Sequence, residues 1–339
     1  MPRTVFGAPF DVATRLMGSL DQAVSITSST VSDGPSAATR RIHVINGDLD
    51  FAVLPDRALD LGQLRVAGVP VAWISPTGFP RVPEAGVDGQ SWLRTFGGGL
   101  LTTCGLLNVG PASQDGDQSH PMHGRISSRP ATVTRTAVVD DEIVIEGIVR
   151  EARVFGENLE LHRRITSPVG ERTVRVADRL VNRGSRPVSP MVLYHLNFGW
   201  PLIDEGTELR SPATEVRPRD EHAAAGVTTW SSFPALRDRY PEQVFQHMLP
   251  RAETVDVEVV NPRGLTIGIR FDSAQLPGLF QWRVAEAGHY VLGVEPSLVP
   301  TILGRTAAHE QNLLVPLEPG HHLDLGVEIT ASTTVASRH

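Results

Sequence analysis

Short runs in which apolar and polar residues alternate recur along most of this chain of 339 residues, separated by turns rich in glycine and proline. The clearest run covers residues 143–149, and others lie near residues 159–162 and 174–177. Because successive side chains of a β-strand point to opposite faces, this alternation is typical of strands with one buried face. Long helical patterns are nearly absent. We therefore predict an all-β fold, an antiparallel β-sandwich.

Turn chemistry supports the same fold near the end of the sequence. Residues 255–259 alternate cleanly, residues 261–264 read Asn-Pro-Arg-Gly, and apolar residues return at every second position over 265–269. Two alternating runs joined by such a turn predict a β-hairpin. A last strand is expected at residues 323–329. Since no change of composition suggests a linker, we expect one domain over residues 1–339.

The charged residues exclude several classes of function. The chain has 31 basic residues and no lysine, so all of them are arginine. Without lysine there is no Schiff base, no lysine-bound pyridoxal phosphate and no P-loop lysine. The net charge of −7 does not favour non-specific binding to nucleic acid, so we expect no nucleic-acid partner.

The single cysteine, Cys104, cannot form a disulfide within the chain and fits a reducing compartment. Because it lies in an apolar run without a nearby base, we expect a buried, unreactive thiol. The first residues lack the apolar run of a signal peptide, and no stretch approaches the roughly 20 apolar residues that a membrane helix needs. We therefore expect a cytoplasmic protein without a membrane partner.

Three polar residues stand among apolar strand residues near the middle and the end of the chain. His195 and Asn197 follow an apolar run and would share one face of a strand. A histidine exchanges protons near neutral pH, although a structural histidine bonded to a backbone carbonyl fits the pattern too. Glu295 follows another apolar run, where it is either a buried general base or a solvated strand-end residue.

A histidine pair and a glycine run have other interpretations. His120 and His123 are spaced like two metal ligands on a helix, but Pro121 and Gly124 disfavour a helix and no cysteine or carboxylate cluster joins them. We therefore expect no metal site and regard His123 as a group that faces a substrate. The glycines at residues 97–99 lack the features of a phosphate loop and indicate close backbone approach instead.

These segments resemble the aldose 1-epimerase (galactose mutarotase-like) superfamily. A His-Gly pair, a histidine in an aromatic motif and a Glu-Pro pair follow in the order of that superfamily, at His123-Gly124, Tyr194–Phe198 and Glu295-Pro296. Within it, the chain resembles the DUF4432-type branch. The segments that carry this closer resemblance are Leu54–Asp60, Trp73–Pro76, Gly98–Gly105 and His123–Arg125.

Two positions depart from the pattern of mutarotases. Leu196 stands where proline usually follows the second histidine, and Pro121-Met122 stands where an Asn-Arg segment usually precedes the first. These departures bear on the identity of the substrate more than on the fold. They leave open whether the reaction is epimerisation at C1.

The resemblance implies the galactose mutarotase-like fold and a reaction on a free sugar. Glu295 would take the proton of the anomeric hydroxyl and His195 would protonate the ring oxygen, and the two would exchange roles when the ring closes. No metal or organic cofactor would be needed. The residues expected to bind the sugar are His123, Arg57, Asn197, Trp282 and Arg125.

Two other functions remain open at this point. One is a sugar-binding protein that has kept the cleft without turnover, and the other is an isomerase or lyase of a sugar acid that uses the same two groups. A homodimer is one expected assembly.

A negatively charged sugar is a further expectation. Arg57, Arg94 and Arg125 lie in or beside the motif segments, and arginine matches the geometry of carboxylates and phosphates. The alternative is that Asp56 and Asp60 simply neutralise Arg57. The expectation requires at least two of these guanidinium groups to point into the cleft without a carboxylate partner.

Overall fold

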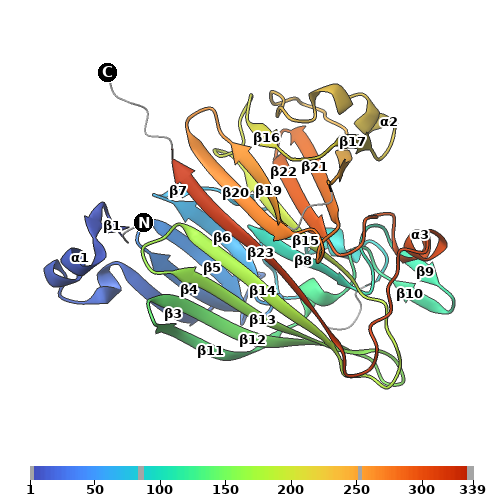
Figure 1. Cartoon of the computed structure of the whole chain (residues 1–339), viewed down its shortest axis with the longest axis horizontal. Helices are drawn as coiled ribbons and strands as arrows, with labels where there is room; N and C mark the ends of the chain where they lie inside the picture. The colour runs from blue at the N-terminus through green and yellow to red at the C-terminus, as the bar shows by residue number, and fades with distance from the viewer. Residues whose placement is uncertain (1–3, 83–87, 251–253, 334–339) are drawn as a thin grey trace.

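Two antiparallel sheets form the body of the protein, seen in a computed structural model that describes residues 4–82, 88–250 and 254–333. Figure 1 shows them as two layers, with β13, β14 and β23 in one and β4, β5 and β6 in the other. In spatial order, the strands of the 8-stranded sheet are β11 (Ala131–Val139), β12 (Glu142–Ala152), β13 (Asn158–Pro168), β14 (Thr173–Asn182), β23 (His322–Thr333), β20 (Leu265–Asp272), β19 (Thr254–Val260) and β16 (Glu208–Arg210).

The 11-stranded sheet is the larger of the two. In spatial order these are β17 (Glu215–Pro218), β18 (Gln243–Met248), β21 (Gly278–Glu286), β22 (His289–Ser297), β15 (Met191–Gly199), β8 (Leu101–Leu106), β6 (Asp60–Val66), β5 (Leu49–Leu54), β4 (Arg40–Asn46) and β3 (Val24–Thr30), with β7 (Val69–Pro70) paired to β6.

The remaining elements are short and lie around the sandwich. The strand pairs are β1 (Thr4–Val5) with β2 (Ala8–Pro9) and β9 (Ser113–Asp115) with β10 (Gln118–His120). The α-helices of the described residues are α1 (Phe10–Leu16), α2 (Glu221–Ala224) and α3 (Arg305–Glu310), and the 3₁₀ turns are η1 (Leu20–Gln22), η2 (Ser91–Arg94), η3 (Ile126–Ser128) and η4 (Val227–Thr229). No helix of the described residues is long and apolar enough to cross a membrane.

The strands form where the sequence alternates, because the alternation separates a core face from a solvent face. In β14, Val174, Val176 and Leu180 are buried in the core while Arg175 and Arg179 reach the surface. The predicted hairpin is confirmed as β19 and β20, paired antiparallel, and the last predicted strand is confirmed as part of β23. The all-β sandwich is thus confirmed, whereas one domain over residues 1–339 stays a prediction.

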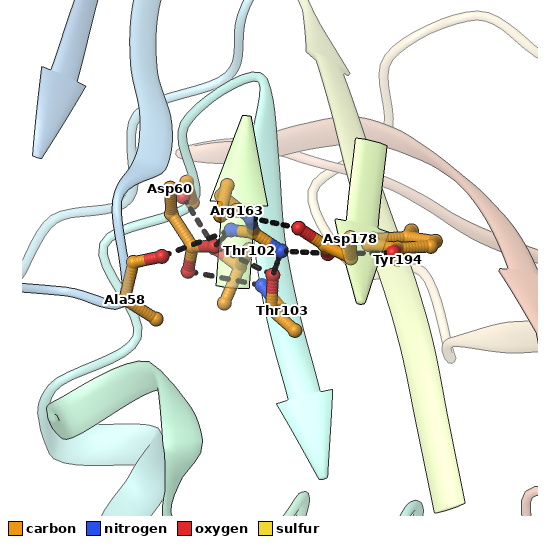
Figure 2. A network of polar contacts seen from close by, with 8 residues as sticks. Ala58, Asp60, Thr102, Thr103, Arg163, Asp178 and Tyr194 are labelled. Carbon is orange, nitrogen blue, oxygen red and sulfur yellow. Dashed lines mark hydrogen bonds and ion pairs between the residues drawn. The ribbon is translucent and has the colours of Figure 1, made fainter. Parts of the chain in front are cut away.

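A buried network of charged groups joins the two sheets behind β15 (Figure 2). Arg163 of β13 donates to Asp178 of β14 (Nε to Oδ1, 2.9 Å) and, across the sandwich, to Asp60 of β6 (Nη1 to Oδ1, 2.7 Å). It also donates to the hydroxyl of Thr103 on β8, and Tyr194 of β15 donates to Asp178 at 2.6 Å. Every side chain in this network is almost completely buried.

Burial would by itself lower the pKa of Arg163, but the carboxylates of Asp178 and Asp60 more than offset it and raise that pKa. A charge this deep is tolerated only because its partners are fixed by hydrogen bonds. Asp60, for example, accepts from both the backbone N–H and the hydroxyl of Thr103. The network therefore fixes β6, β8, β13, β14 and β15 relative to one another.

Replacing Arg163 with alanine should strongly destabilise the fold, because two buried carboxylates would lose their cationic partner. We expect a loss of about 3–5 kcal/mol in the free energy of unfolding, measured by urea denaturation at pH 7. Arg179→Ala is the matched control, since Arg179 pairs with Asp324 on the exposed face of the same sheet and should cost little. Equal losses for the two variants would contradict this role of the network.

Candidate active site

His195 and Glu295 are cross-strand neighbours in the middle of the larger sheet. β15 pairs antiparallel with β22, and the partners Leu196–Val294 and Leu193–Ser297 place His195 opposite Glu295. The Nε2 atom of His195 lies 3.3 Å from Oε1 of Glu295. Both side chains are almost completely buried, at 5% and 3% exposure. The predicted meeting of these two residues in one cleft is confirmed.

The pair lies in the wall of a cavity of about 670 Å³. Aromatic side chains dominate this cavity, and they contact one another and His195: the ring centroids of Phe96 and Trp282 lie 5.3 and 5.4 Å from that of His195. Trp73 makes an edge contact with Trp282 at 6.0 Å. Flat apolar faces beside a few polar groups are typical of sites that bind small organic molecules.

Burial moves the two pKa values in opposite directions. It lowers the pKa of His195 to about 3, with a further lowering by the charge of His123, and raises the pKa of Glu295 to about 8, with a further increase by Glu242. Both shifts disfavour the charged forms in a medium of low polarity. At neutral pH the pair therefore holds one proton, which both residues can carry because their atoms lie within reach.

Asn197 orients His195 rather than facing the cavity. Its Nδ2 donates to the carbonyls of Gly99 (3.0 Å) and His195 (2.8 Å), and its side chain is fully buried. Its amide group favours the charged form of His195 and so opposes part of the lowering of that pKa. The Nδ1 of His195 and the Oδ1 of Asn197 are both buried without a hydrogen-bond partner. A ring proton on Nδ1 of His195 would leave Nε2 free to exchange a proton with Glu295.

His123 lines the same cavity, as predicted. Its ring lies 4.5 Å from that of Trp92 and 6.1 Å from that of His195, measured between centroids. The backbone N–H of Gly110 donates to Nδ1 of His123 at 3.4 Å, and burial lowers the pKa of His123 to about 4. The ring is therefore neutral at pH 7, with Nδ1 as acceptor and Nε2 as the N–H donor available to a ligand.

Three of the predicted sugar-binding residues, Arg57, Arg125 and Asn197, are absent from the cavity lining, which corrects the sequence-based prediction. The Nη2 atom of Arg57 donates to the carbonyls of Pro80 (3.1 Å) and Thr95 (2.7 Å), and Arg57 lines a different cavity. Arg125 donates to the carbonyl of Ser119 at 3.3 Å. The Nδ2 group of Asn197 donates to two backbone carbonyls instead of facing the cavity. Trp282, by contrast, lines the cavity as predicted.

The requirement for an acidic sugar, at least two of the three named arginines in the cavity without a carboxylate partner, is not met. Arg57, Arg94 and Arg125 are all absent from the cavity lining. The arginine that does line it, Arg219, is paired with Glu242 at 2.7 Å and with Asp220 at 2.8 Å.

Sequence reasoning missed most of the aromatic wall. Trp92 and Phe96 stack at 4.1 Å, come from η2 and the loop after it, and show no period that assigns a face. The only available signal was the gathering of aromatic and glycine residues in this segment. Gly98 fits the expected close approach, because a Cβ there would lie 2.5 Å from the carbonyl oxygen of Trp73.

The remaining candidates, His120 and Cys104, do not line the active-site cavity. His120 and His123 line different cavities, so they do not form one metal site. Among the described residues, no group of three or more His, Cys, Asp or Glu side chains is placed to hold a metal ion. Cys104 is fully buried, as expected, and burial raises the pKa of its thiol.

The fold resembles that of galactose mutarotase-like proteins of known structure. A provisionally named aldose 1-epimerase from Klebsiella pneumoniae is 24% identical, with a TM-score of 0.84 over 92% of this chain and 84% of that one. A galactose mutarotase-like protein from Clostridium acetobutylicum is 13% identical, with a TM-score of 0.65 over 92% and 100%. A galactose mutarotase related enzyme from Lactobacillus acidophilus is 14% identical, with a TM-score of 0.61 over 87% and 98%.

At these identities the similarity establishes the fold, which is the galactose mutarotase-like sandwich. The model of a family described as a domain of unknown function, DUF4432, matches residues 36–331. The chain therefore belongs to the DUF4432 family. Among curated proteins, none matches the sequence significantly.

Because Gly293 has no side chain, it leaves room for the side chains of His195 and Glu295 to meet. A Cβ at this position of β22 would lie 2.9 Å from Oε1 of Glu295 and 3.3 Å from Cε1 of His195. Gly293→Ala should therefore displace the carboxylate and lower any activity of the site by about tenfold or more, since misplacement by about 1 Å is costly in catalysis. Gly18→Ala is the control, because a Cβ at that glycine would lie 3.8 Å from its nearest neighbour, an ordinary contact. An unchanged activity for Gly293→Ala, assayed as described below, would contradict this role.

Proposed function

We propose that the protein is a mutarotase or epimerase that interconverts the anomers of a free sugar. The observation that carries the proposal is the buried His195–Glu295 pair, with 3.3 Å between Nε2 and Oε1, in an aromatic cavity. A buried acid–base pair with pKa values shifted apart is typical of proton-transfer sites. The provisional name of the Klebsiella pneumoniae protein with the same fold supports the same reaction class.

The reaction needs one proton to leave the sugar and one to arrive. Glu295 takes the proton of the anomeric hydroxyl while His195 gives its proton to the ring oxygen, so the bond between C1 and the ring oxygen breaks and an open-chain aldehyde forms. Rotation about the C1–C2 bond presents the other face of the carbonyl. The ring then closes with both transfers reversed, and the pair regains its starting proton. The neutral His123 supplies an N–H donor to a sugar oxygen.

The shared proton makes this cycle possible in a buried site. The pair has no net formal charge, whether the proton lies on Glu295 beside a neutral His195 or on His195 beside a carboxylate. Burial favours the first form, and the sugar hydroxyls stabilise the second when they replace solvent around the pair. The transfer of one proton from Glu295 to His195, over the 3.3 Å between Oε1 and Nε2, thus produces the base and the acid together.

The cavity favours an uncharged sugar. Its walls are largely aromatic, which suits the apolar faces of a pyranose or furanose ring, and its one lining arginine, Arg219, is already paired with two carboxylates. The two lining carboxyl groups, Glu242 and Glu295, would repel a sugar acid if ionised. We therefore propose a neutral monosaccharide as the substrate.

Removing either member of the pair should abolish most of the activity. We expect His195→Ala and Glu295→Gln each to lower the rate of anomer exchange by about 10²–10⁴, the usual contribution of general acid–base catalysis. The measurement is NMR exchange spectroscopy or polarimetry on a panel of neutral sugars, with enzyme-free rates subtracted. His309→Ala and Glu215→Gln, on the exposed surface, are the controls. If the wild type exchanges no sugar faster than buffer yet binds one, the protein is a sugar-binding protein instead.

The pH dependence should follow the shared proton. Because the pKa of Glu295 is raised to about 8 and that of His195 is lowered to about 3, the pair holds one proton between these values. We expect kcat/KM to be level from about pH 5 to 7.5 and to fall above about pH 8 as that proton is lost. A kcat/KM that keeps rising through pH 9 would show that the carboxylate alone is the active form.

A further inference from the structure

A second cavity, of about 370 Å³, lies apart from the active site and shares no lining residue with it. It is bordered by the start of β4, the end of β5 and the loop around residue 80. The charged residues of its lining are Arg40, Arg41, Asp56, Arg57 and Arg81.

The charges around this second cavity do not balance. Four arginines line it and only one carboxylate, that of Asp56. Arg40 occupies that carboxylate, because its Nε donates to Oδ1 at 2.9 Å and its backbone N–H donates to Oδ2 at 2.6 Å. Within the described part of the chain, the guanidinium groups of Arg41, Arg57 and Arg81 have no ion-pair partner. Among the described lining residues there is therefore an excess of three positive charges.

Arg57 is the most unusual of the three, because it is buried to all but 8% of its surface. Burial lowers its pKa to about 10, so the group stays charged at neutral pH. Its Nη2 is held by the carbonyls of Pro80 and Thr95, while its Nε is buried with no partner. A buried charge that lacks an opposite charge is costly, and a bound anion would remove this cost.

Asp60, the carboxylate that raises the pKa of Arg57, does not serve as that partner. It attracts Arg57 and raises its pKa, but its oxygens are taken by the guanidinium of Arg163 and by the hydroxyl and N–H of Thr103. Asp60 thus belongs to the network that joins the sheets. Arg57 points from the same segment toward the second cavity, where no carboxylate of the lining is free to bind it.

We propose that this second cavity is a binding site for a small organic molecule that bears an oxyanion, with the phosphate or carboxylate group held by Arg57 and flanked by Arg41 and Arg81. Guanidinium groups match the oxygens of both anions through paired N–H donors. Leu54, Phe79 and Pro130 make the rest of the wall apolar, which suits a short carbon body on the anion. The volume is at the small end of ligand sites, so the ligand is a small metabolite rather than a nucleotide.

Isothermal titration calorimetry at low ionic strength tests this proposal with phosphate, phenyl phosphate, acetate and benzoate. We expect saturable binding of at least one pair, tighter for the aromatic member, and weakening as sodium chloride is raised. Arg57→Gln should weaken binding by about tenfold or more, because it removes the charged donor that would pair with the anion. Arg217→Gln, exposed and paired with Glu215, is the matched control and should bind as the wild type does.

If Arg57→Gln fails to fold, the double variant Arg41→Gln/Arg81→Gln tests the same proposal. We expect this variant to fold, because both side chains are at least partly exposed. It should also weaken binding and reduce its salt dependence. The two anion classes separate the sources: phosphate and phenyl phosphate binding identifies a phosphorylated ligand, and acetate and benzoate binding identifies a carboxylate. The absence of saturable binding by all four probes, or equal binding by the wild type and both sets of variants, would overturn the proposal.

Discussion

The guanidinium of Arg163 is the interaction on which the rest of the structure depends. It lies between two sheets and satisfies an aspartate from each, Asp178 on its own side and Asp60 across the core. Tyr194 bonds to the same Asp178 and directly precedes His195 in β15. Because a one-residue slip of β15 would turn Tyr194 out of the core and break this contact, the network helps to fix the register that presents His195 to Glu295.

Local pattern was enough to predict the strands but not their pairing. Alternation reveals a half-buried strand wherever it occurs, which is why β12, β14, β19 and β20 could be predicted from short windows. The neighbours of β15 are β8 and β22, which lie far from it in sequence, and no window contains both. The meeting of His195 with Glu295 therefore had to be inferred from the resemblance to mutarotases, and the cross-strand register supplies its physical cause.

The errors in the predicted site have a backbone cause. Arg57 stands in the same short motif as Asp60, but Ala58 and Leu59 between them both have positive φ, of 54° and 57°. This sharp turn sends Asp60 into the core and Arg57 toward the second cavity. Such a conformation is unusual for residues other than glycine, so the residues of the motif do not predict it. The aromatic wall was missed for a related reason, since Trp92 and Phe96 lie in irregular segments that have no period.

Because Arg57 lies outside the active-site cavity, burial remains the main influence on the pKa of Glu295. An unpaired guanidinium inside the active-site cavity would favour the carboxylate and lower the pKa of Glu295, opposing the effect of burial. The cation that does line the cavity, Arg219, has this effect, but it is neutralised by Asp220 and Glu242. The carbonyl of Thr95 accepts a hydrogen bond from Arg57, and the next residue, Phe96, belongs to the aromatic wall of the active-site cavity. The unpaired charge and the aromatic wall therefore meet adjacent residues of the chain. The fold thus places the unpaired cation of Arg57 and the acid of Glu295 in the linings of two different cavities.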